Sequence, residues 1–242
     1  MKPNVRLPAL LMDSLRAHAM MFERPLAPRY GDAVGTRMLL AFLGVGVGVF
    51  FALRLAFEAV GLRGRPGTSL AFVLGLLLAF FVAQRVFVRA PLLDIGLRRF
   101  SEWTRLERLY AAQVIPLALV IFSLIFRNHL SMLIEQHGLV GFVFFSVLMG
   151  LLWGMVQEFL YRGWLQTGLT RRFGAVAGVL VANAAYTFGP LHLNFLLGAD
   201  GVHWGSLAAI FGIGLIFGIL YYRSGNLWLP AVLHGLWPLN MT

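Results

Sequence analysis

Four ionisable side chains in the C-terminal half of the chain could take part in hydrolytic chemistry. Glu158 and Arg162 are four residues apart in a long apolar segment, a spacing that places them on one face of a helix. His192 and His234 lie in later apolar segments, each shortly after a proline that loosens a helix. Ionisable groups inside an apolar span are costly and mark candidate functional sites. A buried structural ion pair would also explain Glu158 and Arg162.

Two kinds of reaction fit a carboxylate and two imidazoles. In the first, the carboxylate takes a proton from water, and a histidine orients the water or donates to the leaving group. In the second, Glu158, His192 and His234 hold a divalent metal such as zinc with an open position for water. Both predict hydrolysis of an acyl bond. The chain has no HExxH or GxSxG sequence and no cysteine, which argues against the usual zinc-protease helix, a serine elbow and a thiol nucleophile.

The expected depths of these residues in a membrane agree. A tight turn is expected at 172–174, and Glu158 lies about 14 residues before it, or about 21 Å at the helical rise. His192 lies about 19 residues after the turn, or about 28 Å, and His234 about 9 residues, or about 14 Å, beyond a break expected at 224–225. We therefore expect the three side chains to share one slab of the membrane while lying on different helices.

The elements that must position these residues are apolar helices. Hydrophobic residues make up 59% of the chain and charged residues 12%, and the mean hydropathy is +0.79. A protein this apolar has lipid as its solvent. The fold class predicted is all-α, a polytopic membrane bundle of about six to eight transmembrane helices plus interfacial amphipathic helices. The expected apolar stretches are 38–57, 67–84, 109–126, 136–162, 173–191, 204–222 and a short one at 227–239.

The predicted domains follow from these stretches. Residues 1–37 form an N-terminal segment, expected to be either a short interfacial helix or an unstructured tail. Residues 38–135 form accessory transmembrane helices. Within them the linker 85–108 is expected to hold an amphipathic helix at the interface, with Trp103 at headgroup depth, or else a soluble loop helix. Residues 136–242 form the core that carries the candidate site.

The net charge of +10 comes almost wholly from arginines placed between the apolar stretches. This placement favours anionic lipid headgroups as partners and argues against nucleic acid. The N-terminal segment, the 85–108 linker, the 172–174 turn and the 224–225 break carry most of the arginines. The positive-inside rule therefore predicts a cytoplasmic N-terminus.

The order and spacing of the candidate residues resemble the CPBP family of intramembrane endopeptidases. This family is also called the Abi or CAAX-protease family and is related to the Rce1-type prenyl-protein endopeptidases. The resemblance covers about 138–240. The matching parts are Gln157-Glu158 followed by Arg162-Gly163, Phe188 four residues before His192, and His234 after a glycine-rich span and a Leu-Trp pair.

This chain departs from the family pattern at two positions. Gln157 stands where the family has its first glutamate, the residue to which water activation is assigned, and glutamine cannot act as a general base. Pro238 stands where the third part of the pattern has asparagine, and Asn240 lies off that face. The resemblance implies a glutamate-type mechanism in which His192 assists the base and His234 lies in the oxyanion site. Either Glu158 is then the base or Gln157 only positions water.

The leading functional hypothesis is an intramembrane endopeptidase of a bacterial inner membrane. Its expected substrate is a membrane protein or lipid-anchored protein, cleaved in or near a membrane-embedded C-terminal segment, as in the processing of a sorting signal. The alternative is a catalytically impaired scaffold, chaperone or immunity protein of the same fold, which the departures at Gln157 and Pro238 favour. A transporter with a proton relay through Glu158 and His192 ranks lower because no inverted repeat is visible.

Overall fold

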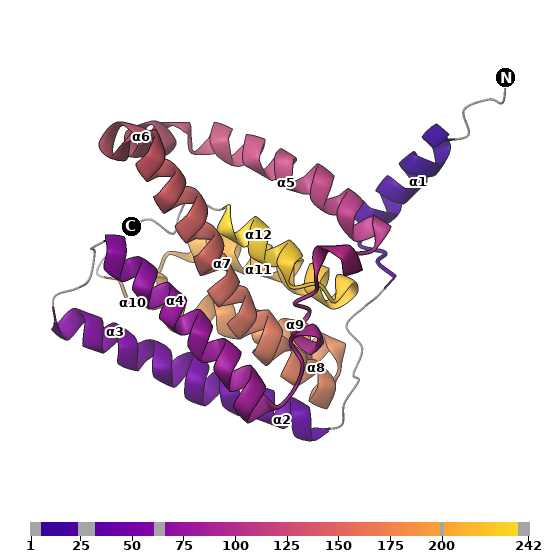
Figure 1. Cartoon of the computed structure of the whole chain (residues 1–242). Coiled ribbons are helices and arrows are strands. Elements are labelled where there is room, and N and C mark those ends of the chain that lie inside the picture. The colour runs from indigo at the N-terminus through magenta and orange to yellow at the C-terminus, as the bar shows by residue number, and fades with distance from the viewer. Residues whose placement is uncertain (1–5, 24–31, 61–65, 199–200, 237–242) are drawn as a thin grey trace.

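The structure, a computed structural model, describes residues 6–23, 32–60, 66–198 and 201–236 (Figure 1). Every regular element in these ranges is helical, and none is a strand. The chain is a polytopic helical membrane protein, so the predicted all-α fold class is confirmed. Pro238 and Asn240 lie outside the described residues.

The N-terminal half of the chain contains both short and long helical elements. In chain order they are α1 (Arg6–His18), α2 (Asp32–Ala41), η1 (Phe42–Val49), α3 (Phe50–Ala59), α4 (Pro66–Ala83), η2 (Gln84–Val88), η3 (Leu92–Ile95), η4 (Phe100–Glu102), α5 (Arg105–Ile125) and α6 (Arg127–Phe142). The C-terminal half contains η5 (Val143–Met149), α7 (Gly150–Glu158), η6 (Phe159–Gln166), α8 (Thr167–Phe173), α9 (Ala175–Phe188), η7 (Pro190–His192), α10 (Leu193–Leu197), α11 (Trp204–Ser224) and α12 (Trp228–Gly235).

The described residues contain four helices long and apolar enough to cross a membrane, or five if a bent pair counts as one span. The four are Ala33–Leu53, Thr68–Val88, Arg105–Ile125 and Trp204–Ser224, and the bent pair is Arg127–Phe142 with Val147–Phe173. This is fewer than the six to eight expected. The reason is that α9 has 14 residues and α12 has 8, so both are shorter than a bilayer core. Neighbouring helices enclose most of α12, whereas α9 keeps one apolar side exposed, with Val176 and Val181 on it.

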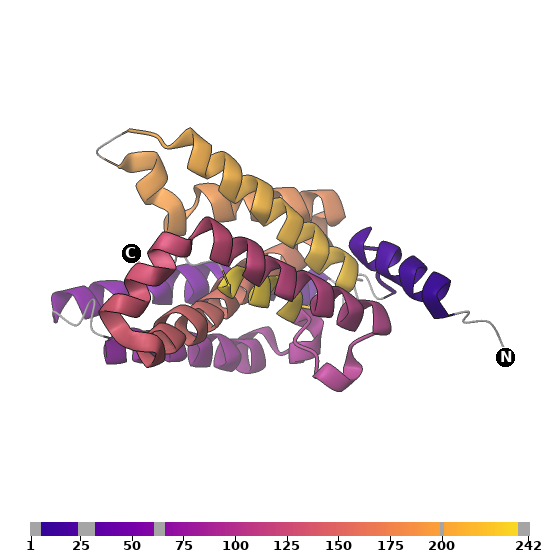
Figure 2. The ribbon, with the colours of Figure 1, turned by 90° about the horizontal axis from the view of Figure 1, so that it is seen from above.

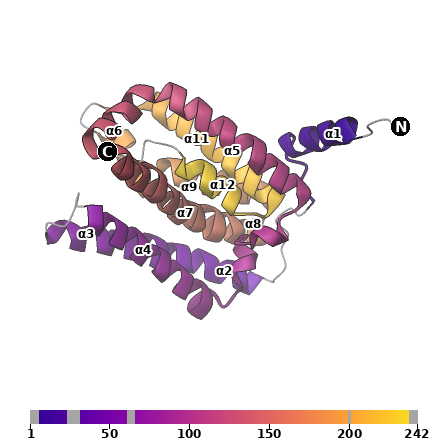
Figure 3. The same cartoon turned by 45° about the horizontal axis from the view of Figure 1, so that its top comes forward.

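The continuous helical rod of α7, η6 and α8 runs through the middle of the molecule (Figure 1). Helices α2, α3 and α4 form a layer on one side of this rod, and α9, α11 and α12 lie on the other side (Figure 3). Helix α12 packs on α7, α9 packs on α8 and α11, and α2 packs on α8. Because α12 is surrounded in this way, its residue His234 is only 7% exposed.

The prediction of an amphipathic helix in 85–108 is wrong, because this linker does not form one continuous helix. The chain there forms the short turns η3 and η4, because Gly96 adopts a left-handed conformation with φ 78° and Thr104 caps the start of α5. The segment docks on the α11–α12 turn, where Arg98 donates to the carbonyl of Gly225 at 2.9 Å. This tethering replaces the independent interfacial helix that the pattern suggested.

The predicted N-terminal helix is present as α1. It packs against the first half of α5 and extends past the N-terminal end of α5 (Figure 2). Asp13 pairs with Arg105 at 3.1 Å and Ser14 donates to Gln113 at 2.9 Å. The opposite side of α1 exposes Leu11 and several neighbouring apolar residues. An apolar face of this kind on a short helix beside a span is typical of a helix at the membrane interface.

Candidate active site

A polar stripe on the central rod forms one wall of the candidate site. Glu158, Arg162 and Gln166 recur every four residues and therefore share a face of the rod. All three are buried among apolar residues. The backbone between Glu158 and Gln166 is wound as a π-helix, a form that is frequent at functional sites.

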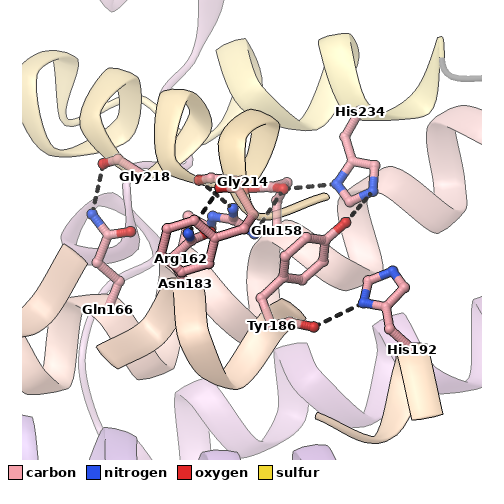
Figure 4. A network of polar contacts seen from close by, with 10 residues as sticks. Glu158, Arg162, Gln166, Asn183, Tyr186, His192, Gly214, Gly218 and His234 are labelled. Atoms are coloured by element: carbon pink, nitrogen blue, oxygen red, sulfur yellow. Dashed lines mark hydrogen bonds and ion pairs between the residues drawn. The ribbon is translucent and has the colours of Figure 1, made fainter. Parts of the chain in front are cut away.

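Glu158 makes the central contacts of the site, as the sequence predicted from its position. It is fully buried, and its Oε1 accepts a hydrogen bond from Nδ1 of His234 at 2.8 Å (Figure 4). The same oxygen lies 3.2 Å from Nη1 of Arg162. The other oxygen, Oε2, is buried with no hydrogen-bond partner among the described residues. The carboxylate thus joins the central rod to α12 and has a positive charge beside it.

Arg162 joins the rod to α11. Its Nη2 donates to the carbonyl of Gly214 at 2.8 Å, and one turn further along Gln166 donates to the carbonyl of Gly218 at 2.8 Å. A Cβ atom at Gly214 would lie 2.3 Å from Oδ1 of Asn183 and 3.3 Å from Nη2 of Arg162. The glycine therefore makes room for the guanidinium to reach the α11 backbone.

His192 is held by the break that follows α9. Its Nδ1 lies 2.8 Å from the carbonyl oxygen of Tyr186, which can only accept, so Nδ1 carries the proton. In the neutral ring Nε2 is then the acceptor. Burial lowers the pKa of His192 and outweighs the opposite effect of the hydrogen bond to Tyr186. The ring is consequently neutral at neutral pH, and it is only partly buried.

Tyr186 is a central member of the site that the sequence analysis missed. Its hydroxyl lies 3.1 Å from Nε2 of His234, and its ring packs edge-on against His192 with centroids 4.8 Å apart. The guanidinium of Arg162 lies 4.6 Å from the centre of the same ring. Its position six residues before His192 was the available signal, since Tyr186 lies in the last turn of α9 and His192 in η7 directly after it. We call Glu158, Arg162, Tyr186, His192 and His234 the polar cluster.

The remaining predicted site residues lie outside the polar cluster. Gln157 is buried on α7 beside Glu158. Phe188 is 44% exposed and faces Phe211 of α11, with ring centroids 6.4 Å apart. Asn183, which the sequence analysis also missed, lies near Arg162 (Figure 4) and donates to the carbonyl of Phe211 at 3.0 Å.

The side chains of the polar cluster do not form a metal site in this arrangement. No group of three histidine or acidic side chains among the described residues is placed to hold an ion. Glu158 directs Oε1 to Arg162 and His234, and His192 contacts Tyr186. A zinc site built from Glu158, His192 and His234 does not fit this geometry, and we assign no metal-dependent step to it.

The helices and the polar cluster define a multi-pass membrane protein with a buried carboxylate–histidine site. Residues 139–239 match the model of a family described as type II CAAX prenyl endopeptidase Rce1-like. The predicted resemblance to the CPBP or Rce1-like family is confirmed over this region, which contains the whole polar cluster. Comparisons with curated proteins and with solved structures give no match.

Proposed function

We propose that this protein is an intramembrane endopeptidase. The observation that carries the proposal is the hydrogen bond of 2.8 Å between Glu158 and His234, beside a second histidine whose Nε2 is an acceptor. The description of the family that matches residues 139–239 supports peptide hydrolysis. The proposed substrate is a membrane or lipid-anchored protein, cleaved near a membrane-embedded C-terminal segment such as a sorting signal. The proposed location is a bacterial inner membrane, with anionic lipids around its arginines.

His192 is the proposed base, because it is the more exposed histidine and its neutral ring has Nε2 as an acceptor. Nε2 takes a proton from water as the water oxygen bonds to the scissile carbonyl carbon. The carbon–nitrogen bond then breaks, and protonated His192 returns the proton to the departing amine. Glu158 is fully buried, so its proposed role is to hold His234 in one tautomer and orientation.

The test is cleavage of a peptide that carries an apolar C-terminal segment by the full chain in detergent or proteoliposomes. His192→Ala is expected to lower kcat by about 10²–10⁴-fold, the usual contribution of a general base. The matched control is His203→Ala, since His203 lies on the loop before α11 and outside the polar cluster. Equal cleavage by the wild type and His192→Ala would contradict the proposed base.

One observation favours a second candidate, a non-catalytic scaffold, chaperone or immunity protein. Gln157 is buried next to Glu158 and cannot abstract a proton, while Glu158 is engaged by Arg162 and His234. Under this alternative the wild type cleaves no peptide, and Gln157→Glu gains activity. Cleavage by the wild type would exclude it.

A further inference from the structure

Tyr186 contacts three members of the polar cluster, each through a different part of its structure. The hydroxyl meets Nε2 of His234 at 3.1 Å, and the backbone carbonyl accepts from Nδ1 of His192 at 2.8 Å. The face of the ring carries the guanidinium of Arg162 at 4.6 Å. The residue therefore sets the spacing between the two imidazoles and also determines which nitrogen of each ring is engaged.

Three of the other N–H donors of the polar cluster are directed at protein acceptors. His234 donates from Nδ1 to Glu158, and His192 donates from Nδ1 to the Tyr186 carbonyl. Arg162 donates from Nη2 to the carbonyl of Gly214, and its Nη1, which makes no hydrogen bond among the described residues, lies 3.2 Å from Oε1 of Glu158. Redirecting any of these donors would leave a buried carboxylate or carbonyl unsatisfied, which is costly.

The hydroxyl of Tyr186 differs from these donors. Nδ1 of His234 is a donor toward Glu158, so when the ring carries a single proton Nε2 is an acceptor and the Tyr186 O–H donates to it. A hydroxyl hydrogen turns about the C–O bond while the ring stays in place. The tyrosine can therefore redirect its hydrogen bond without any movement of the helices, and the turn leaves Nε2 of His234 without this donor.

We propose that Tyr186 is a catalytic residue that donates a hydrogen bond to the carbonyl oxygen of the scissile peptide. The hydroxyl turns from His234 to this oxygen as negative charge develops on it, and the proton stays on the tyrosine. The Arg162 guanidinium against the ring favours this charge nearby. This inference rests on the proposed endopeptidase function, and it assigns the two imidazoles different tasks, with His192 facing the water and His234 holding the donor.

The experiment compares Tyr186→Phe with Tyr161→Phe in the peptide-cleavage assay. Tyr161 is a matched control because it is also buried and packs edge-on against Tyr186, with centroids 5.2 Å apart, but it lies outside the polar cluster. Tyr186→Phe is expected to lower kcat by about 10²–10³-fold, as removal of one oxyanion donor does, with KM unchanged. Tyr161→Phe is expected to leave both constants within a few-fold. A wild-type kcat in folded Tyr186→Phe would overturn the inference.

Two further measurements keep the outcomes distinct. A wild type that cleaves no peptide would overturn the proposed function and this inference with it, whereas an active wild type with an unimpaired Tyr186→Phe variant overturns the inference alone. If Tyr186→Phe does not fold, 2,3-difluorotyrosine at position 186 retains the ring and hydroxyl but makes the donor more acidic. It is expected to change kcat without changing KM, while the same replacement at 161 changes neither. An unchanged kcat in the 186 variant would overturn the inference.

Discussion

At the scale of single residues, the site depends on a buried charge pair. Glu158 and Arg162 are 0% and 1% exposed, and Glu158 places one oxygen 3.2 Å from Nη1 of Arg162 and 2.8 Å from Nδ1 of His234. Removal of one partner of a buried pair leaves an uncompensated charge in a low-dielectric interior. The free energy of unfolding of the protein therefore depends on the presence of both charges.

We expect Glu158→Gln to destabilise the protein by about 3–5 kcal/mol, because the Arg162 charge would remain buried without its counter-ion. The double variant Glu158→Gln/Arg162→Met is expected to be less destabilised than the sum of the two single variants. Denaturant or thermal unfolding of all four proteins in one detergent measures the coupling. Additive effects of the two changes would contradict a buried, coupled pair.

A pH dependence follows from the environment of His192. Burial lowers the pKa of His192, so its neutral form persists to a lower pH than that of a solvent-exposed imidazole. Below this pKa the protonated ring cannot accept a proton from water. We therefore expect kcat/KM to be constant at neutral pH and to fall as the pH drops through the lowered pKa. A rate that rises on acidification would show that the protonated ring is the active form.

At the scale of helices, close packing of α7 on α12 fixes the distance between Glu158 and His234. A Cβ atom at Gly154 would lie 2.6 Å from the backbone nitrogen of Gly235 and 2.7 Å from the carbonyl of Ala231. The two helices approach this closely because neither has a side chain at the contact, as in glycine-rich helix pairs in membranes.

We expect Gly154→Ala to push α12 away from α7, weaken the hydrogen bond between Glu158 and His234, and destabilise the protein by about 1–3 kcal/mol. Cleavage should fall with it, although no residue of the polar cluster changes. Gly75→Ala on α4 is the matched control, because its Cβ would meet no atom within 4 Å and alanine is the better helix former. Unfolding and kcat are measured on both variants, and equal behaviour would disprove the packing argument.

The sequence predicted where helices end and which neighbouring residues share a helical face, because nearby residues determine both. The turn at Gly174, with φ 88°, and the break at Gly225, with φ 59°, lie where they were expected. The spacing of Glu158 and Arg162 also predicted their shared face. The roles of Tyr186 and Gly214 were missed, because they depend on how α9 and α11 pack against the rod. The 85–108 linker was mistaken for a helix because helical spacing of apolar residues does not reveal docking on a distant turn.

At the scale of the whole molecule, α5 gives the clearest sign of the lipid environment. Only 6% of its most apolar 18-residue segment is buried within the protein, and the mean hydropathy of this segment is 1.9. Its second half exposes large apolar side chains on nearly every side, including Leu117, Val120, Leu124 and Ile125. Exposure of such a large apolar surface to water would be unfavourable, so lipid must cover it.

The membrane orientation can be tested on either side of α5, because the chain has no cysteine of its own. Ser101→Cys precedes α5 and Asn128→Cys follows it, and both positions are exposed. The arginine bias predicts that Ser101 shares the cytoplasmic side with the N-terminus. In intact cells, a membrane-impermeant maleimide is therefore expected to label Asn128→Cys and to label Ser101→Cys only after lysis. The reverse pattern would invert the orientation, whereas labelling of both in intact cells would mean that α5 does not span the membrane.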